Sequence, residues 1–319
     1  MRVLVTGATG FVGKYLLQLL VDRRLTVFGT FRDSNPSDIP GAVELLRCDL
    51  RDPGRVRSIL RKTRPTQVYH LAGLSSVTRS FFNVQDVWQC NLLGALNLME
   101  AVREVTPKAR VLMVGSGQCY GSRERHRAII ETCALLPESP YAASKAAADL
   151  LGYQFFHSYG LQIVRIRPFN HTGPGQAPEF VCSDWARQVA EIDLGLRSPI
   201  VKVGDLGVSR DFSDVRDVVR AYEVLMRCGI VGEAYNVASN RATSLRTILD
   251  WLISFCSRPI HISVQPERIR GIEVRKLYGS NRKLRNATDW KPKYKLDTTL
   301  RDLYLYWKKT LAADHRLAY

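Results

Sequence analysis

Met1-Arg-Val-Leu-Val-Thr-Gly7-Ala-Thr-Gly10-Phe-Val-Gly13 opens the chain, and this stretch decides the fold. A short apolar strand runs directly into a glycine-rich turn, and a leucine-rich helix follows the turn. Glycines at this spacing permit a tight turn, let the backbone approach a pyrophosphate and allow the helix to pack closely on the strand. The N-terminus of that helix would face the anion. Gly7, Gly10 and Gly13 therefore predict a dinucleotide-binding loop.

The first two-thirds of the chain alternate between short strands and helical segments. The sequence predicts buried parallel strands at Arg2–Val5, Thr26–Phe31, Val43–Arg47, Gln67–His70, Arg110–Val114 and Gln162–Arg167. It predicts helices between them at Lys14–Arg23, Val56–Arg64, Val84–Val105 and Tyr141–Tyr159. This alternation is typical of the α/β class, and we predict a Rossmann-type, doubly wound parallel sheet.

The pattern loosens after Pro168, where further prolines divide the chain into shorter pieces. Helices are predicted at Trp185–Gly195, Val215–Arg227 and Ser244–Phe255. We expect a smaller, mixed C-terminal region that binds the substrate. The predicted division is a cofactor-binding domain with the catalytic residues in 1–170 and a mainly substrate-binding region in 171–319, with the chain crossing between the two.

Composition and charge narrow the class of protein. The chain has 319 residues, of which 45% are hydrophobic and 24% charged, as in globular proteins. The sequence has no apolar run of membrane-spanning length, and we expect no signal peptide. The seven dispersed cysteines predict reduced thiols in the cytoplasm without disulfides or a metal site. The net charge of +16 is spread over the chain, so we expect a positive cleft for an anionic small molecule and no nucleic-acid binding.

A second stretch, Ser139-Pro140-Tyr141-Ala142-Ala143-Ser144-Lys145, predicts proton-transfer chemistry. Residues four apart on a helix project from the same face, so Tyr141 and Lys145 are neighbours. A phenol that moves a proton near neutral pH needs a pKa below its usual value of about 10. We expect the Lys145 ammonium to lower the pKa of Tyr141. A dinucleotide loop and a proton donor together predict redox chemistry on an alcohol or ketone.

The choice of dinucleotide is made at the end of the second strand. An acidic residue there would bind a ribose 2′-hydroxyl, and a basic residue would bind a 2′-phosphate. The strand ends at Arg32, which favours NADP(H), and Asp33 follows, which leaves NAD(H) open. Asp49 and Leu50, after the third strand, are candidates to hold the adenine amino group, with a loop cap as the alternative for Asp49.

Several motifs together resemble the extended short-chain dehydrogenase/reductase family. They are Gly7-x-x-Gly10-x-x-Gly13, His70-Leu71-Ala72-Gly73, Asn91, Ser116 ahead of Tyr120-Gly121, and Tyr141-x-x-x-Lys145. Later stretches are similar to its GDP-mannose-processing branch: Arg167-Pro-Phe-Asn170-His171-Thr-Gly-Pro-Gly-Gln176, Gly204-Asp-Leu-Gly-Val-Ser-Arg210-Asp211-Phe212 and Gly279-Ser-Asn-Arg-Lys-Leu. The resemblance runs from residue 1 to about residue 308, and within the branch it is strongest to reductases of GDP-4-dehydro-6-deoxy-D-mannose.

The resemblance implies roles for individual residues. Tyr141 would protonate the oxygen of a sugar C4 ketone, Ser116 would hydrogen-bond the same oxygen, and Lys145 would bind the nicotinamide ribose. The cofactor set that it implies is Gly7, Gly10, Phe11, Val12, Gly13, Arg32, Asp49, Leu50, Leu71, Ala72, Tyr141 and Lys145. The substrate set is Ser75, Ser116, Gln118, Asn170, Lys202, Arg210, Arg270 and Glu273, where arginine would grip a diphosphate.

One position departs from the pattern of related GDP-mannose 4,6-dehydratases, which place a glutamate two residues after the catalytic Ser or Thr. This chain has Gln118 there, and glutamine cannot remove a proton at neutral pH. The resemblance therefore implies an NADPH-dependent oxidoreductase that converts GDP-4-dehydro-6-deoxy-D-mannose to GDP-D-rhamnose. The alternatives are a dehydratase or epimerase of the same fold, a reductase that yields GDP-6-deoxy-D-talose, and a non-catalytic dinucleotide sensor. A homodimer formed through the helix that bears Tyr141 is also expected.

Overall fold

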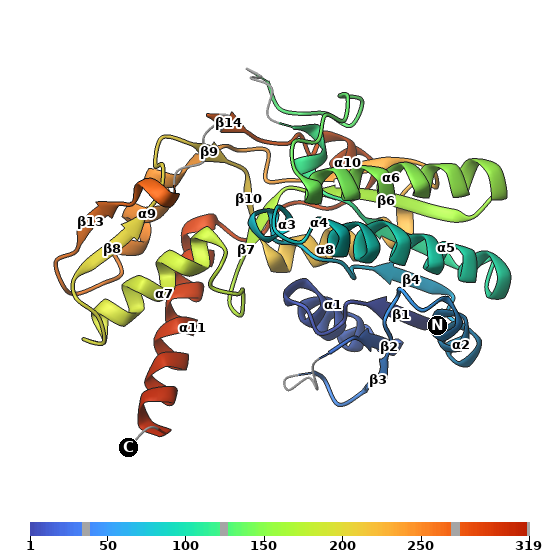
Figure 1. Cartoon of the computed structure of the whole chain (residues 1–319), viewed down its shortest axis with the longest axis horizontal. Coiled ribbons are helices and arrows are strands. Elements are labelled where there is room, and N and C mark those ends of the chain that lie inside the picture. The colour runs from blue at the N-terminus through green and yellow to red at the C-terminus, as the bar shows by residue number, and fades with distance from the viewer. Residues whose placement is uncertain (34–38, 122–126, 269–274, 318–319) are drawn as a thin grey trace.

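Seven parallel strands form the central sheet, with helices on both of its faces (Figure 1). The computed structural model describes residues 1–33, 39–121, 127–268 and 275–317. In spatial order the strands are β11 (Ala234–Val237), β6 (Gln162–Pro168), β5 (Arg110–Val114), β4 (Gln67–His70), β1 (Arg2–Thr6), β2 (Thr26–Phe31) and β3 (Val43–Arg47). This order reverses beside β1, as in doubly wound dinucleotide-binding folds, so the predicted fold class is confirmed.

The helices of the described residues vary widely in length. They are α1 (Phe11–Asp22), α2 (Pro53–Thr63), α3 (Val77–Ser80), α4 (Val84–Trp88), α5 (Gly94–Val105), α6 (Pro140–Tyr159), α7 (Val181–Asp193), α8 (Val215–Cys228), α9 (Leu245–Ile253), α10 (Arg282–Ala287) and α11 (Leu296–Leu317). A π-helical turn spans Gln89–Leu93, and 3₁₀ turns span Gly117–Tyr120 and Pro266–Arg268. None of the described helices is long and apolar enough to cross a membrane.

Two apolar layers hold the central sheet. On one face α1 and α8 pack together through side chains such as Leu16, Leu20 and Tyr222. On the other face α2, α5 and α6 pack through residues such as Leu60 and Leu98. Because the inner strands are covered on both sides, strands such as β1 and β5 read in the sequence as continuous apolar runs.

The part of the chain after residue 170 builds a second apolar core. We call α7, α9 and α11 with their small sheets the C-terminal region, and Trp185, Ile248 and Leu303 are buried within it. Its short strands are β7 (Asn170–Thr172), β8 (Ile200–Val203), β9 (Ser209–Arg210), β10 (Phe212–Asp214), β12 (Thr243–Ser244), β13 (His261–Val264) and β14 (Lys276–Leu277). The chain also returns to the first core, because α8 covers the central sheet and β11 pairs with β6.

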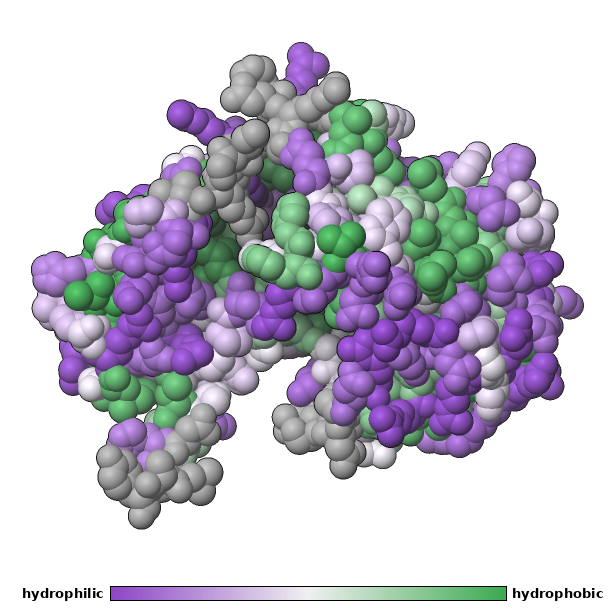
Figure 2. All heavy atoms as spheres, viewed as in Figure 1, coloured by the Kyte–Doolittle hydropathy of each residue, from purple (hydrophilic) through white to green (hydrophobic). Residues whose placement is uncertain are grey.

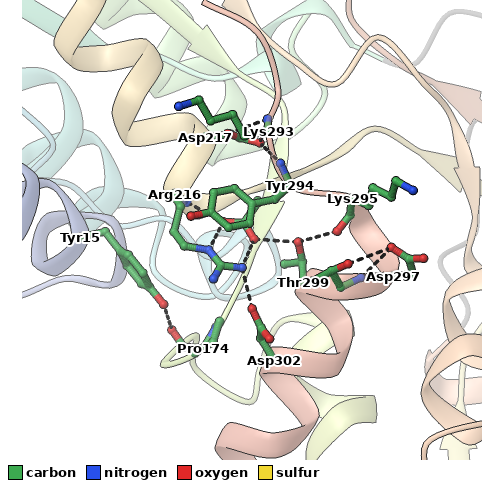
Figure 3. A network of polar contacts seen from close by, with 12 residues as sticks. Tyr15, Pro174, Arg216, Asp217, Lys293, Tyr294, Lys295, Asp297, Thr299 and Asp302 are labelled. Atoms are coloured by element: carbon green, nitrogen blue, oxygen red, sulfur yellow. Dashed lines mark hydrogen bonds and ion pairs between the residues drawn. The ribbon is translucent and has the colours of Figure 1, made fainter.

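A polar network joins α11 to β10 and to α8, one of the helices that cover the central sheet (Figure 3). Arg216, in the first turn of α8, pairs with Asp302 of α11 at 2.7 Å and with buried Asp214 at 2.6 Å. Its guanidinium lies 3.8 Å from the centre of the Tyr294 ring, which favours a cation–π contact. Close by, the Tyr15 hydroxyl of α1 donates to the Pro174 carbonyl at 2.8 Å. These contacts fix α11, and the C-terminal region with it, relative to the cofactor side of the sheet.

Candidate active site

A cleft of about 1140 Å³ lies between the carboxyl ends of the central strands and the C-terminal region, and Figure 2 shows the hollow between the two parts. This volume exceeds the roughly 300–1,000 Å³ of a typical single-ligand pocket. Sixteen of the expected site residues line it: Gly7, Gly10, Phe11, Val12, Gly13, Arg32, Asp49, Leu50, Leu71, Ala72, Ser75, Ser116, Gln118, Tyr141, Asn170 and Arg210. Residues distant in the sequence therefore meet around a space with room for two ligands.

The glycine-rich loop has the geometry that a pyrophosphate requires. Gly7 has a φ of +69°, in the left-handed region, and a Cβ on it would lie 2.8 Å from the backbone of Ala72. A Cβ on Gly13 would lie 2.4 Å from the Gly7 carbonyl oxygen, so α1 can approach the loop this closely only with glycine there. The first N–H groups of α1 face the cleft with no side-chain cap from Gly10. This cradle fits a dinucleotide.

The end of β2 carries charges of both signs. The Arg32 guanidinium donates to the Asp33 carboxylate and, at 3.5 Å, to the Cys90 sulfur. Arg51 also lines the cleft here, and its Nη2 donates to Asp49 at 2.6 Å, which lowers the pKa of Asp49. Arg51 was missed by the sequence reasoning, although it lies two residues after Asp49. The two guanidiniums suit a phosphate group, and Asp33 keeps an acceptor for a hydroxyl within reach.

Tyr141 and Lys145 lie at the start of α6, beneath the cleft. Ser139 caps this helix by accepting from the Ala142 N–H at 3.1 Å, and Pro140 occupies the first turn. The Ser116 side chain lies beside the Tyr141 hydroxyl and lowers its pKa, so the expected pair of hydroxyls meets. Lys145 is buried, and its Nζ donates to the Val114 carbonyl at 2.8 Å. Tyr141, Ser116 and Lys145 are therefore assembled from α6 and the end of β5.

We expected Lys145 to lower the pKa of Tyr141, and this prediction is wrong for the protein without a ligand. Burial raises the pKa of Tyr141 to about 12, and the Ser116 side chain only partly opposes this rise. Burial lowers the pKa of Lys145 to about 8. The physical reason is that both groups lose water, while the Lys145 ammonium is directed at a backbone carbonyl. The phenol is consequently protonated at neutral pH, which is the form that a proton donor needs.

Asn91 holds the segment after β4 against α6 by hydrogen bonds. Its Oδ1 accepts from the Leu74 N–H at 2.8 Å, and its Nδ2 donates to the Leu74 carbonyl at 3.1 Å and to the Ser144 hydroxyl at 3.0 Å. The sequence predicted one continuous helix over Val84–Val105, but the π-helical turn Gln89–Leu93 interrupts it at this residue. A π-turn rotates the side chains that follow it, and such turns are frequent at functional sites.

Some of the predicted substrate-binding residues line the cleft and others do not. Ser75, Gln118, Asn170 and Arg210 line the cleft, whereas Lys202 is exposed on β8, outside the cleft wall that the described residues form. Arg270 and Glu273 lie outside the described residues.

Arg268 was also missed by the sequence reasoning, although it lines the cleft. Its Nη1 donates to Asp184 at 2.7 Å and to the Lys202 carbonyl at 3.2 Å. Asp184 belongs to the first turn of α7, so Arg268 is an additional fixed cation at the substrate end. Nothing in the local sequence distinguishes it from the other basic residues.

The fold and the cleft define a class: a doubly wound α/β protein with a dinucleotide loop and a Tyr-x-x-x-Lys helix. A family model described as GDP-mannose 4,6 dehydratase matches residues 4–303. The chain therefore belongs to this family, and it is an enzyme of the oxidoreductase type.

Individual relatives agree with this assignment over nearly the whole chain. GDP-6-deoxy-D-mannose reductase of Pseudomonas aeruginosa is 35% identical, with 98% of this chain and 99% of the relative covered. GDP-mannose 4,6 dehydratase 1 of Arabidopsis thaliana is 29% identical, with 98% and 92% covered. The structure of RMD from Pseudomonas aeruginosa complexed with NADPH is similar at a TM-score of 0.85 and 33% identity, with 97% and 100% covered. The expected resemblance to GDP-mannose-processing enzymes is thus confirmed.

Proposed function

We propose that this enzyme reduces the C4 ketone of GDP-4-dehydro-6-deoxy-D-mannose with NADPH and releases GDP-D-rhamnose. The observation that carries the proposal is the composition of the cleft around Tyr141. Ser116 and Tyr141 lie side by side in the cleft lining, and Gln118 belongs to the same wall. An amide at this position can hydrogen-bond a sugar hydroxyl but cannot act as the base of an elimination. Similarity to a relative named as a reductase supports the same reaction.

The chain's own residues supply the proton and the orientation of the substrate. NADPH, when bound along the glycine-rich loop, would supply the hydride. Tyr141 is protonated because burial raises its pKa to about 12, so it can donate its proton to the ketone oxygen. The Ser116 hydroxyl hydrogen-bonds the same oxygen as negative charge develops there. Lys145 holds the nicotinamide ribose, and Asn170 and Arg210 hold the diphosphate side of the nucleotide sugar.

NADPH is the cofactor that we propose, with NADH as a weaker substitute. Arg32 and Arg51 bring two guanidiniums to the end of β2, where a 2′-phosphate would lie. The NADPH complex of a structure that is 33% identical supports this choice. Asp33, which pairs with Arg32, gives a 2′-hydroxyl an acceptor and explains why NADH would retain some affinity.

The direct test is incubation of the enzyme with GDP-4-dehydro-6-deoxy-D-mannose and NADPH. We expect loss of absorbance at the nicotinamide band in a one-to-one ratio with product, and an NMR spectrum of GDP-D-rhamnose. Tyr141→Phe should abolish turnover while NADPH still binds. Absence of NADPH oxidation by the wild type would reject the proposal, and GDP-6-deoxy-D-talose as product would correct its stereochemistry.

A dehydratase or epimerase is the second candidate, because the Arabidopsis relative carries the name of a dehydratase. Such enzymes regenerate their dinucleotide within each cycle. The stoichiometry separates the two classes: a reductase consumes one NADPH per product, and a dehydratase or epimerase consumes none. Conversion of GDP-D-mannose without net NADPH oxidation would favour this second candidate.

We further propose that the enzyme is a homodimer joined through α6 and α5. Leu150 and Tyr153 of α6 are 58% and 45% exposed, and Leu93, at the end of the π-helical turn that precedes α5, is 47% exposed. Figure 2 shows hydrophobic surface in this part of the molecule. Most alanines of α6 are buried within the domain, so Leu150 is the better probe of an interface. Leu150→Glu should convert a dimer to a monomer in analytical ultracentrifugation. A wild type that sediments as a monomer would contradict the proposal.

Two further assignments complete the proposed function. Residues 1–170 would bind NADP(H) and carry the catalytic groups, and residues 171–319 would mainly bind the nucleotide sugar. We place the enzyme in the cytoplasm, because all seven cysteines are free thiols, as expected in a reducing compartment.

A further inference from the structure

Two arginines of β6 share one buried carboxylate of the catalytic helix. Asp149 lies on α6, two turns after Tyr141, and its side chain is 1% exposed. Arg167 binds it with two donors, Nε to Oδ1 at 3.1 Å and Nη2 to Oδ2 at 2.8 Å. Arg165 donates to the same Oδ2 through Nη1 at 2.7 Å. The forked contact of Arg167 fixes both the distance and the direction of the pair.

The remaining contacts of the two guanidiniums lie in different parts of the molecule. Arg165 donates from Nη2 to the Gly232 carbonyl at 2.9 Å, and its guanidinium lies over the exposed Tyr153 ring. Arg167 donates from Nη1 to the Tyr120 hydroxyl at 2.8 Å, and that hydroxyl donates to Asn236 Oδ1 at 2.8 Å. Arg165 therefore contacts residues near the surface, whereas Arg167 contacts the turn beside the candidate active site.

Tyr120 closes the short turn that carries the Ser116 hydroxyl. Ser116 caps the 3₁₀ turn Gly117–Tyr120 by accepting from the Gln118 N–H at 3.1 Å. The Phe169 ring stacks on Tyr120 at 6.3 Å between ring centres, and a Cβ on Gly117 would lie 3.0 Å from the same ring. The C-terminal end of the turn is thus clamped between Phe169 and the Arg167 guanidinium.

The start of the turn lies close to the same ion pair. Gly115 precedes Ser116, and a Cβ on it would lie 3.7 Å from Asp149 Oδ1 and 3.8 Å from the Arg167 side chain. The Gly115 N–H donates to the Ile166 carbonyl of β6 at 2.7 Å. Both ends of the Ser116 turn therefore lie against the Asp149–Arg167 pair, which joins α6 to β6.

We propose that Asp149, Arg167 and Tyr120 form a positioning network that sets the Ser116 hydroxyl against the Tyr141 hydroxyl. The three residues lie behind the cleft and are not part of its lining. Asp149 fixes the helix of Tyr141, Tyr120 fixes the turn of Ser116, and Arg167 joins them by charge-assisted hydrogen bonds. This inference rests on the proposed reductase function, because it assigns the network a role in protonating the ketone.

Arg165 provides a matched control, because it binds the same carboxylate without contacting the Ser116 turn. The variants are Tyr120→Phe, Arg167→Lys and Arg165→Lys. Tyr120→Phe removes a single oxygen, so it tests the network even where Arg167→Lys fails to fold. Each variant is assayed for kcat, KM for the nucleotide sugar, Kd for NADPH and Tm.

We expect Tyr120→Phe and Arg167→Lys to lower kcat by about 10- to 100-fold, with KM and the NADPH Kd changed by less than about twofold. Arg165→Lys should lower Tm but keep kcat within about twofold of the wild type. A merely structural pair would affect both arginines alike. Equal losses of kcat in Arg165→Lys and Arg167→Lys, or wild-type kcat in Tyr120→Phe, would overturn the inference.

Hydrogen exchange separates failure of this inference from failure of the proposed function. Amide exchange over residues 115–121 should accelerate in Tyr120→Phe and Arg167→Lys and stay at the wild-type rate in Arg165→Lys. If the wild type does not reduce the sugar, the proposed reaction is rejected, and the exchange pattern alone decides the positioning role. Unchanged exchange in all three variants rejects the network.

Discussion

Lys145→Met should stabilise the protein without cofactor at pH 7 while it abolishes reduction. Burial lowers the pKa of Lys145 from 10.5 to about 8. The ionised side chain therefore costs the folded state about 3 kcal/mol. Methionine removes this cost but also removes the hydrogen bond to the Val114 carbonyl, which is worth about 1 kcal/mol. We expect a net gain of about 2 kcal/mol in the free energy of unfolding at pH 7.

The lowered pKa of Lys145 also determines how the stability difference between the wild type and Lys145→Met changes with pH. At pH 7 both the folded and the unfolded wild type carry the ammonium, so the full cost applies. Between the folded pKa of about 8 and the unfolded pKa of 10.5, only the unfolded chain keeps the proton, so wild-type stability rises with pH. The advantage of Lys145→Met should therefore shrink between pH 8 and pH 10.

Urea unfolding followed by circular dichroism at pH 7 and pH 10 measures both effects. Lys108→Met is the matched control, because Lys108 is exposed and should show no difference that depends on pH. A Lys145→Met protein that is less stable than the wild type at pH 7 would refute the reasoning. So would a stability difference that stays constant between the two pH values.

Three further outcomes follow from the same geometry. Arg32→Ala should raise the Kd for NADPH by about 10- to 100-fold and change that for NADH much less, as measured by nicotinamide fluorescence; equal losses would contradict the proposed role of Arg32. Gly13→Ala places a methyl group 2.4 Å from the Gly7 carbonyl oxygen and should abolish cofactor binding in the same titration, whereas Gly41→Ala, where nothing lies within 4 Å, should bind normally. The value of kcat/KM should fall above pH 8, because Lys145, with a pKa of about 8, loses its charge there; a flat profile to pH 10 would argue against a charged Lys145.

The central sheet could be predicted because its information is local. Strands such as Gln67–His70 and Arg110–Val114 have the bounds that the apolar runs indicate, since strands covered on both faces leave uninterrupted apolar runs. Ala234–Val237 was missed as a strand, although it forms the edge beside β6. Its place in the sheet depends on pairing with β6, which is distant in the sequence, and the local sequence does not indicate that contact.

Some residues of the candidate site could likewise be predicted from local motifs, whereas others could not. Tyr141 and Ser116 could be named because their motifs are local, and the structure brings their side chains together. The raised pKa of Tyr141 could not be predicted, because it depends on burial by distant segments. Arg51 and Arg268 could not be distinguished among 46 lysines and arginines, because only the folded cleft selects them.

Deuterium transfer from NADPH labelled at its reactive C4 position tests the central claim most directly. The account predicts one deuterium at C4 of the sugar for each NADPH oxidised, found by NMR of the product, and loss of this transfer in Tyr141→Phe. Oxidation of NADPH with no deuterium at C4, or full transfer in Tyr141→Phe, would contradict it.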